Sequence, residues 1–557
     1  MKLGNLDISA MKVGSSAVTA AYLGSTLVYS GGTPPIPPTP TFQGKWLATY
    51  DGGSTSSADC DSSSAITNGE ITTIDLHSVE IGDCVTEIGD YAFESCEFLS
   101  SVTIPNSVTI IREGVFSNCP SLSSITIPDT VIEIGDFAFQ GCISLSSFNI
   151  PSGVTSMSNG MLSDCYSLYN YTIPSTITSI GNDVFGGCEN LTSVTIPDSV
   201  TSIGQNVFNY CTSLTSVNIP SGVTSIGNMV FNTCSSLPSI TIPSGITTIG
   251  NNAFVNCSSL TSVMFEQGSQ LTSIGYNAFL NCSSLPTIEI PSGVTSIAQN
   301  AFNNCSSLTS ITFEQGSQLS TIGVAAFQQC YNLSNITIPD SVTSIGNYAF
   351  NQCTSLPSIT IPSGVTSIGG GMIFSDCSSL SSITVDSNNQ YFDSRNNCNA
   401  IIDSSSDELI VGCNYTVIPS SVTSIGEAAF SSRHYLESVV IPSGATSIGQ
   451  GAFEWCESLT SVTISEGVQN IWYGAFLGCG MTDITIPSTV TFIGGDAFQE
   501  CYDMVSATIL ATVPPQTDGT VFGGDFPIYV PAASVSTYQA DSGWSEYASR
   551  IQAIPNS

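Results

Sequence analysis

The sequence predicts a mainly β solenoid, in which short strands of successive repeats stack in parallel around one continuous core. Three observations predict it. A phenylalanine recurs at steps of 23 to 25 residues, the same apolar and polar pattern precedes it each time, and a cysteine follows three residues later. A chain of 557 residues exceeds the usual size of one globular core. A repeat array explains how such a chain still buries its apolar residues, because each repeat covers its neighbour.

The phenylalanine positions mark the individual coils. The series is Phe93, Phe116, Phe139, Phe185, Phe208, Phe231, Phe254, Phe279, Phe302, Phe327, Phe350, Phe374, Phe430, Phe453, Phe476 and Phe498, with Leu162 in the one skipped place. These positions define seventeen coils. The prediction is therefore a stack of about 17–18 coils, capped at both ends because an open edge of paired strands invites aggregation.

One coil, LTSVTIPDSVTSIGQNVFNYC at 191–211, illustrates the strand pattern. Alternation over Ser-Val-Thr-Ile predicts a strand with Val194 and Ile196 facing the core and Thr195 facing solvent. Pro197 ends this strand, because proline has no amide hydrogen to donate to a neighbouring coil.

The second half of the same coil predicts a second strand and a closing turn. Val200 and Ile203 are expected to point inward, and Gly204 permits the sharp turn that follows. The Val-Phe-x-x-Cys stretch is expected to form one short helical turn that fills the coil with an aromatic ring.

The repeat unit resembles the BspA-type, or treponemal-type, leucine-rich repeat over about residues 66–510. Its match lies at the Leu, Ile, Ile-Pro, Val, Ile-Gly, Ala-Phe and Cys positions. The resemblance implies a leucine-rich-repeat stack of parallel strands. It also implies binding to host proteins, extracellular matrix or other cells, without one ligand common to the family.

Sixteen of the twenty cysteines, from Cys96 to Cys501, occupy the position three residues after the phenylalanine. One cysteine per coil predicts a column of buried, reduced thiols. Neighbouring thiols in such a column lie near disulfide distance, so bridges between coils remain an alternative. Cys398 and Cys413, in the irregular part of the array, are the expected exceptions. No Cys-x-x-Cys pair occurs, which argues against structural zinc.

The composition limits the classes of partner. Seven basic residues against 43 acidic ones give a formal net charge of −36. That charge repels nucleic acid and anionic membrane surfaces. Serine, threonine and asparagine supply most of the polarity, which suits hydrogen bonding to sugars or peptides and equally suits solubility alone. No run of eighteen apolar residues predicts a membrane span, and the first sixteen residues make a poor signal peptide.

No residue pattern predicts an enzyme, a metal site or a cofactor. His77 and His434 are 357 residues apart and are expected on the surface. Ser431 and Ser432 adjoin His434, but the segment lacks the pattern of a catalytic triad. Arg433 takes the place of a cysteine in the column, which predicts a coil that is locally distorted or open to water.

An irregular repeat at about 378–420 breaks the rhythm, because 56 residues separate Phe374 from Phe430. Residues 400–402 and 409–411 predict a hairpin across a polar turn. The segment is either a structural variant coil or a protruding binding loop.

In the binding-loop interpretation Tyr391, Phe392 and Arg395 are exposed ligand contacts. Asp386, Asn388 and Asp393 carry side-chain oxygens of the kind that bind calcium. Their spacing lacks the glycine and the closing glutamate of a calcium loop.

The first thirty residues form a different repeat of ten residues, with Lys2, Lys12 and Tyr22 in equivalent places. This pattern resembles N-terminal segments of virion proteins from phages of gut bacteria. It predicts an anchor, including Tyr22, Leu23 and Gly24, that joins other virion or envelope proteins. The predicted domains are the β anchor 1–30, a proline-rich linker 31–41, an N-terminal cap 42–70, the repeats 71–510 and a C-terminal cap 511–557.

Together these features predict a non-enzymatic binding protein. The first hypothesis is a fibre-like phage appendage, assembled in the bacterial cytoplasm, that presents its surface to a host surface protein or glycan of a bacterium or mucosa. The second is a bacterial cell-surface adhesin, and the third is a structural spacer without a ligand. A homo-oligomer is compatible with all three.

Overall fold

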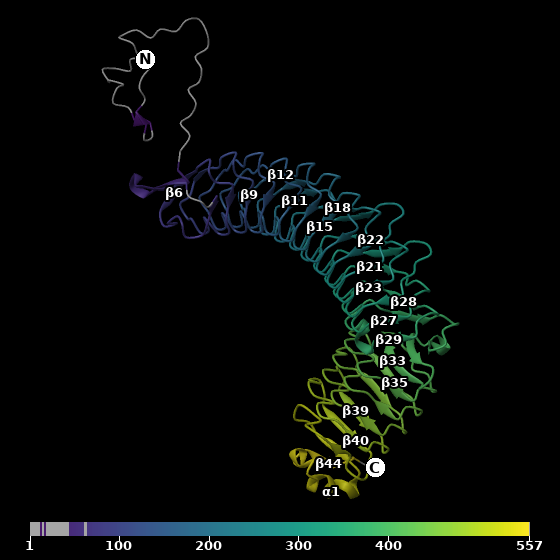
Figure 1. The fold of residues 1–557 in the computed structure, drawn as a ribbon. Helices are drawn as coiled ribbons and strands as arrows, with labels where there is room; N and C mark the ends of the chain where they lie inside the picture. Colours follow the sequence, from purple (N-terminus) through teal and green to yellow (C-terminus); the bar gives the residue numbers. More distant parts are fainter. Residues whose placement is uncertain (1–11, 14–15, 18–43, 61–63, 556–557) are drawn as a thin grey trace, which may run out of the picture. The chain divides into compact units, whose positions relative to one another are not determined.

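The computed structural model describes residues 12–13, 16–17, 44–60 and 64–555. It divides into two units, Met1–Val200 and Thr201–Ser557. Within each unit, successive coils of parallel strands lie side by side (Figure 1). The predicted solenoid is confirmed. The described part has about 21 turns rather than 17–18.

The first unit begins with an antiparallel pair and then a four-stranded sheet in the order β4-β3-β6-β8. Its strands and 3-10 helix are β1 (Lys12–Val13), β2 (Ser16–Ala17), β3 (Trp46–Tyr50), η2 (Asp51–Gly53), β4 (Thr55–Ala58), β5 (Ala65–Ile66), β6 (Leu76–Ile81), β7 (Glu87–Ile88), β8 (Ser101–Thr103), β9 (Ile110–Ile111), β10 (Glu133–Ile134), β11 (Ser156–Met157), β12 (Asn170–Thr172), β13 (Ser179–Ile180) and β14 (Ser193–Thr195). Strand β3 pairs antiparallel with both β4 and β6, and parallel pairing begins with β5 and β7 and with β6 and β8.

Two families of strands form the regular part of the second unit. The short strands are β15 (Ser202–Ile203), β17 (Ser225–Ile226), β19 (Thr248–Ile249), β21 (Ser273–Ile274), β23 (Ser296–Ile297), β25 (Thr321–Ile322), β27 (Ser344–Ile345) and β29 (Ser367–Ile368). The second family has strands of two to four residues, namely β16 (Ser216–Val217), β18 (Ser239–Ile242), β20 (Ser262–Phe265), β22 (Thr287–Ile290), β24 (Ser310–Phe313), β26 (Asn335–Ile336), β28 (Ser358–Ile361) and β30 (Ser382–Val385). From β17 to β29 the short strands pair in one parallel ladder.

The rest of the second unit contains the irregular coil and the C-terminal end. Its elements are η3 (Gly371–Phe374), β31 (Phe392–Asp393), η4 (Arg395–Asn397), β32 (Ala400–Asp403), β33 (Glu408–Gly412), β34 (Ser424–Ile425), β35 (Ser438–Ile441), β36 (Ser447–Ile448), β37 (Ser461–Ile464), β38 (Asn470–Ile471), β39 (Asp483–Ile486), β40 (Phe492–Ile493), β41 (Ser506–Ile509), β42 (Gln516–Thr517), β43 (Ile528–Val530), η5 (Ala532–Ser534), α1 (Val535–Ala540), η6 (Ser545–Tyr547) and β44 (Ile551–Ala553). The predicted hairpin is confirmed, since β32 and β33 pair antiparallel.

The strand pattern of the repeat follows its alternation. Val194 and Ile196 are buried and Thr195 is exposed, as predicted. Val200 is buried, whereas Ile203 is only partly covered. The core of each coil therefore comes from alternate residues of two short strands.

The predicted helical turn around each phenylalanine is wrong in the regular coils. In residues 252–256, here called the Phe turn of that coil, Asn252 and Asn256 have φ values of 57° and 59°. These left-handed residues on either side of Phe254 prevent a helix from continuing. The amides of Asn252, Phe254 and Asn256 instead donate to carbonyl oxygens of the next coil at 2.8, 2.8 and 2.9 Å. The Phe turns thus form a third hydrogen-bonded side of the coil.

The phenylalanine rings stack in a buried column, as predicted. Phe254 and Phe279 lie 5.1 Å apart with a 2° angle between their planes, and Phe279 and Phe302 lie 5.2 Å apart at 3°. Leu162 is buried in the skipped place. A ring that fills the coil and contacts its neighbours gives dense packing without a continuous hydrophobic sequence.

Most column cysteines donate a hydrogen bond to a backbone carbonyl of the preceding coil. The thiol of Cys282 donates to the carbonyl oxygen of Phe254 at 3.2 Å, and that of Cys305 donates to Phe279 at 3.2 Å. Sulfur is a weak donor, but these thiols are buried beside a carbonyl that has room for a second partner. All sixteen column cysteines are buried and none of them forms a disulfide, which confirms the predicted buried column.

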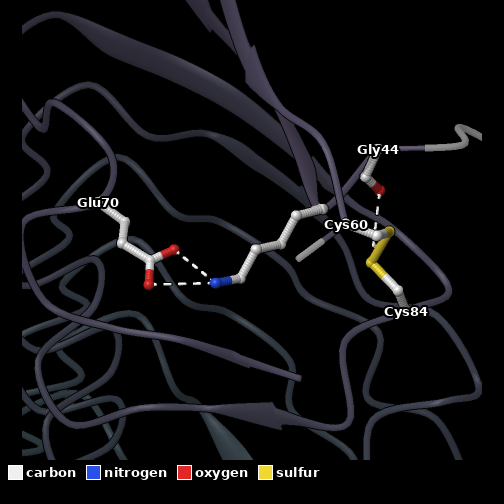
Figure 2. The surroundings of a disulfide bond; sticks show 5 residues. Gly44, Cys60, Glu70 and Cys84 are labelled. Carbon is white, nitrogen blue, oxygen red and sulfur yellow. Dashed lines mark hydrogen bonds and ion pairs between the residues drawn. A yellow bond between two sulfur atoms is a disulfide. The ribbon is translucent and has the colours of Figure 1, made fainter. Parts of the chain in front are cut away.

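The prediction that Cys398 and Cys413 are the exceptions to the reduced thiols is wrong. Cys398 and Cys413 are free and buried, because each lies in the core of the irregular coil. The disulfide joins Cys60 to Cys84 near the start of the first unit (Figure 2). Beside it the ammonium of buried Lys45 lies 2.9 Å from a carboxylate oxygen of Glu70. A covalent bond and an ion pair therefore fasten the first strands to the coils that follow.

Arg433 does not open its coil to water, which excludes one of the two predicted outcomes and leaves the locally distorted coil. Its side chain is 1% exposed, because the guanidinium turns inward and finds buried acceptors. Nη1 donates to the Phe374 carbonyl at 2.6 Å, and Nε donates to the Gly412 carbonyl at 2.9 Å. Burial lowers the pKa of the Arg433 guanidinium. The arginine thus reaches the acceptor that a cysteine would serve in a regular coil.

The C-terminal segment packs three aromatic side chains under the final coils. Tyr538, Trp544 and Tyr547 are buried, and Tyr547 contacts Phe522 edge-on at 6.1 Å. The Tyr547 hydroxyl accepts hydrogen bonds from the amides of Val521 (2.7 Å) and Phe522 (3.2 Å). These amides belong to the turn that follows the last Phe turn. The Tyr547 hydroxyl is their acceptor, in the place of the carbonyl oxygens that a following coil provides in the regular array.

Candidate functional site

The irregular coil places the predicted ligand contacts in different environments. Tyr391 is 53% exposed, whereas Phe392 is 5% exposed, so the prediction that Phe392 is exposed is wrong. Successive residues entering β31 point to opposite faces, which turns Phe392 inward when Tyr391 faces solvent. The Asn389 side-chain oxygen fixes this arrangement by accepting both amides, at 2.8 and 2.9 Å.

Arg395 is held by two carboxylates of the same coil. Its Nε and Nη2 donate to Asp393 at 2.8 and 2.6 Å, and Nη1 donates to Asp407 at 2.6 Å. Burial raises the pKa of Asp393, but the hydrogen bonds from Arg395 outweigh it, so that pKa lies below its ordinary value. A bidentate pair of this kind rigidifies a turn and leaves less of the guanidinium for a ligand.

The residues weighed for calcium have other partners. The Asp386 carboxylate accepts the amide and the side chain of Asn388 at 2.8 and 3.0 Å, and Asp393 is bound to Arg395. Across residues 44–60 and 64–555, no three His, Cys, Asp or Glu side chains cluster in a way that suits a metal ion.

The two histidines lie beside acidic residues. His434 Nε2 is 3.4 Å from Asp376 Oδ1, and His77 Nε2 is 3.8 Å from Asp51 Oδ1. Ser431 is buried next to His434, but its hydroxyl makes no contact with the imidazole that would form a nucleophile. No helix in the described part of the chain is long and apolar enough to cross a bilayer. The anchor residues Tyr22, Leu23 and Gly24 lie outside the described residues.

A second candidate site arises where two successive coils lose the small residues of the repeat. The outward row of the short strands carries serine or threonine at every step from β17 to β29, and serine in β34 and β36. In the next three strands this row reads Asn470, Phe492 and Gln516, which pair in register. Trp472 stands where most coils have the glycine of Ile-Gly.

These substitutions line an open hollow of about 670 Å³, called here the aromatic groove. Its lining residues are Asn470, Trp472, Ser488, Val490, Thr491, Phe492, Ala511, Thr512, Val513, Pro514 and Gln516. The Trp472 side chain is 46% exposed, and its ring lies 5.2 Å from that of Phe492 at an angle of 52°. Since the two rings are not stacked flat on each other, aromatic surface remains open to a ligand.

Neighbouring carboxylates are bound to the protein at the edge of the groove. Glu466 accepts the amide and the hydroxyl of Ser488, both at 3.1 Å, and these bonds lower the pKa of its carboxyl group. The Tyr473 hydroxyl donates to Asp496 at 2.6 Å. The hydrogen bonds orient Ser488 and keep the Glu466 carboxylate at the edge.

Sequence reasoning missed the aromatic groove, although a signal for it was present. The repeat Val-Thr-Ser-Ile-Gly becomes Val-Gln-Asn-Ile-Trp at 468–472 and Val-Thr-Phe-Ile-Gly at 490–494. An alignment of the coils shows Phe492 at a position that is serine or threonine from β17 to β29, and Trp472 at a position that is glycine in most coils. The irregular repeat instead predicts a ligand contact at Tyr391.

The geometry defines a repeat solenoid with a ligand-sized groove at one end of a row of small residues. The chain belongs to the BspA-type leucine-rich repeat family, whose six-copy repeat model matches residues 65–192, 178–291, 272–402 and 408–511. The resemblance of the repeat unit to this family is thereby confirmed. The matched residues include the whole regular array and most of the irregular coil.

Several solved structures are similar to the chain. A leucine-rich cell-surface protein of Faecalibacterium prausnitzii is 30% identical, over 64% of this chain and 88% of that one, with a TM-score of 0.43. A leucine-rich-repeat protein of Bacteroides ovatus is 23% identical, over 85% and 98%, with a TM-score of 0.42. The pneumococcal vaccine antigen PcpA is 18% identical, over 69% and 87%, with a TM-score of 0.42. No functionally curated protein is significantly similar to the chain.

Proposed function

We propose that the chain is a non-enzymatic binding protein, displayed on a surface, whose solenoid contacts its ligand at the aromatic groove. The observation that carries the proposal is the pair of aromatic side chains in successive coils: Phe492 stands on the row that is serine or threonine from β17 to β29, and Trp472 stands where most coils have glycine. Exposed tryptophan next to polar rim residues is typical of the energetic centre of a binding surface. Tyr391, on the irregular coil, is a proposed second contact.

Binding by the full chain to bacterial cells and to mucin layers tests this proposal. Trp472→Ala is expected to weaken binding, because it removes the largest exposed ring of the groove. Trp455→Ala is the matched control, since Trp455 is also a partly exposed tryptophan of the second unit, 37% exposed, but lies outside the groove. Equal binding by parent and Trp472→Ala contradicts the groove as the contact. No binding to either surface favours a spacer without a ligand.

Two locations compete for this binding protein. The cell-surface adhesin is supported by family membership and by the Cys60–Cys84 disulfide, because disulfides persist in oxidising surroundings rather than in the cytoplasm. The phage appendage is supported by the ten-residue repeat of residues 1–30. We favour the bacterial cell surface, since a protein assembled in the cytoplasm forms such a bond less readily.

Fractionation of the parent protein distinguishes the two locations, and a deletion of residues 1–41 tests the anchor. The repeats have their own core, so the shortened chain is expected to fold and to keep ligand binding. If Tyr22, Leu23 and Gly24 help to anchor the chain, the deletion variant fails to co-purify with virions or with cell envelopes. The fraction in which the parent protein is found identifies its location. Normal incorporation of the variant contradicts an N-terminal anchor.

A further inference from the structure

We propose that the aromatic groove binds a neutral saccharide, with a sugar ring stacked on Trp472 and its hydroxyl groups hydrogen-bonded to neighbouring amides. This inference rests on the proposed function and adds the chemical class of the ligand.

The lining of the aromatic groove is uncharged. None of its eleven lining residues is acidic or basic, in a chain whose formal net charge is −36. An anionic ligand meets a repulsive field without a compensating cation, and a cationic ligand finds no carboxylate in the lining. The nearest carboxylate partner of a lining residue, Glu466, already accepts two hydrogen bonds from Ser488. The groove therefore suits an uncharged molecule.

Rings and amides alternate in a way that suits a sugar. Phe492 lies on β40, and the strands on either side of it carry Asn470 and Gln516 in register. Neighbouring strands are about 4.8 Å apart, which puts an amide on each side of the aromatic surface. An amide donates and accepts hydrogen bonds, as sugar hydroxyls do. The apolar C–H face of a sugar ring can lie on Trp472 while its hydroxyl edge reaches these amides.

The strands beneath the groove disfavour a peptide added as a further strand. β40 is already paired with β38 on one side and β42 on the other. Its backbone groups are therefore unavailable for strand addition. A volume of about 670 Å³ falls within the range of about 300–1,000 Å³ typical of small-molecule sites. The groove is thus large enough for a short oligosaccharide.

Calorimetric titration of the full chain tests the inference with named probes. The neutral probes are maltohexaose, cellohexaose, mannohexaose and chitohexaose, and hexagalacturonate is the charged probe. At least one neutral hexasaccharide is expected to bind saturably, and hexagalacturonate is expected not to bind. Trp472→Ala is expected to weaken binding at least about tenfold, as for a tryptophan at the centre of an interface.

Conservative variants distinguish stacking from folding. Trp472→Phe keeps an aromatic face and is expected to retain part of the affinity, whereas Trp455→Ala is expected to bind like the parent. Trp472 is more exposed than the other three tryptophans, so saccharide binding is expected to shift the protein's fluorescence, and Trp472→Phe is expected to abolish that shift. Saturable binding that is unchanged in Trp472→Ala overturns the inference. Failure of all four neutral probes to bind the folded parent overturns it too.

Treatment of the target surface separates this inference from the proposed function. Periodate cleaves vicinal diols of surface glycans, and protease removes surface proteins. Loss of Trp472-dependent binding after periodate supports the saccharide. Binding that survives periodate, is lost after protease and still depends on Trp472 overturns the saccharide while the proposed function stands. Loss of Trp472 dependence on every surface overturns both.

Discussion

The regular coils from β17 to β29 and the irregular coil that follows them each contain a buried phenylalanine carbonyl that accepts a hydrogen bond. The donor differs between the two regions. In a regular coil the phenylalanine carbonyl accepts a hydrogen bond from the thiol of the cysteine in the following coil, as Phe254 does from Cys282 at 3.2 Å. At the irregular coil the next position in the column is Arg433, whose Nη1 reaches the Phe374 carbonyl at 2.6 Å. The longer side chain spans the distance that the inserted hairpin creates.

The ring column is interrupted at the same place. Phe254 and Phe279 stack at 5.1 Å, whereas Phe430 packs against the backbone of Gly412. A Cβ atom at Gly412 would overlap the Phe430 ring, so this position requires glycine. The comparison shows that a repeat array tolerates a long insertion when substitutions restore both the packing and the hydrogen bond that the insertion displaces.

Phe254→Ala tests the packing of the regular coils and has the largest expected effect. The ring is fully buried between two others, and the coils cannot collapse inward to fill its place. We expect a loss of about 3–5 kcal/mol in unfolding free energy. Urea denaturation followed by circular dichroism measures it. An unchanged midpoint would mean that the ring column contributes little to the core.

Arg433→Met tests the hydrogen bonds of the irregular coil. Methionine keeps much of the volume but leaves the Phe374 and Gly412 carbonyls without their donor. Each orphaned buried acceptor costs about 1–3 kcal/mol, and removal of the buried charge offsets part of this, so we expect a net loss of about 3 kcal/mol. Arg433→Cys is the informative companion, because a thiol cannot reach Phe374 across the hairpin. Stability equal to the parent in Arg433→Cys would contradict the bridging role.

Tyr547→Phe tests whether buried backbone groups at the C-terminal end of the array also need a hydrogen-bond partner. The change deletes one oxygen, which accepts the buried amides of Val521 and Phe522. We expect a loss of about 2 kcal/mol, within the range of about 1–3 kcal/mol for an unsatisfied buried group. Thermal unfolding by calorimetry measures it. Tyr529→Phe, which changes another tyrosine of the C-terminal segment that is only partly buried, is the control and is expected to melt like the parent.

The thiol column predicts a smaller effect that appears at alkaline pH. Burial raises the pKa of the Cys257 thiol from an ordinary value of 9.0 to about 12. The folded state therefore holds this proton more tightly than the unfolded state. Its contribution to stability is complete below pH 9 and is lost as pH rises through about 12. Melting temperatures measured from pH 8 to pH 11 are expected to fall more for the parent than for Cys257→Ala.

The same burial protects the thiols from chemical modification. At pH 8 only about one Cys257 thiol in ten thousand is a thiolate, so iodoacetamide is expected to leave the native column unmodified. After denaturation without reductant, mass spectrometry is expected to find every cysteine alkylated except Cys60 and Cys84. Bridges between successive coils would contradict the reduced column.

The regular repeat was predictable because every position recurs. Val194, Thr195 and Ile196 alternate as a strand does, and the spacing of the phenylalanines predicts the stack. The Phe turn was not predictable in this way, since Ala-Phe-x-x-Cys suits a helix by composition, and only the left-handed residues beside Phe254 exclude one. The Cys60–Cys84 disulfide joins residues outside the regular column, so the repeat carries no information about it.

The candidate sites show a similar division. The hairpin of the irregular coil followed from its alternation, but the burial of Phe392 depends on how Asn389 holds the preceding turn. Arg433 was expected at a defect, because a charged residue in a buried column lacks a partner in its own sequence neighbourhood. Its partners, Phe374 and Gly412, are far away in the chain and come near only when the hairpin folds.

The direction of the hydrogen bonds in the Phe turns has a consequence for assembly. Each Phe turn of the regular coils donates its amides toward the following coil, so on this side of the coils the C-terminal end of a stack presents unpaired donors. Two such molecules could polymerise only head to tail, with the acceptors of one added to the donors of the other. At the donor end the Tyr547 hydroxyl already occupies the amides of Val521 and Phe522. The Tyr547 hydroxyl thus gives these two amides, within the same chain, the acceptor that a further coil would otherwise supply.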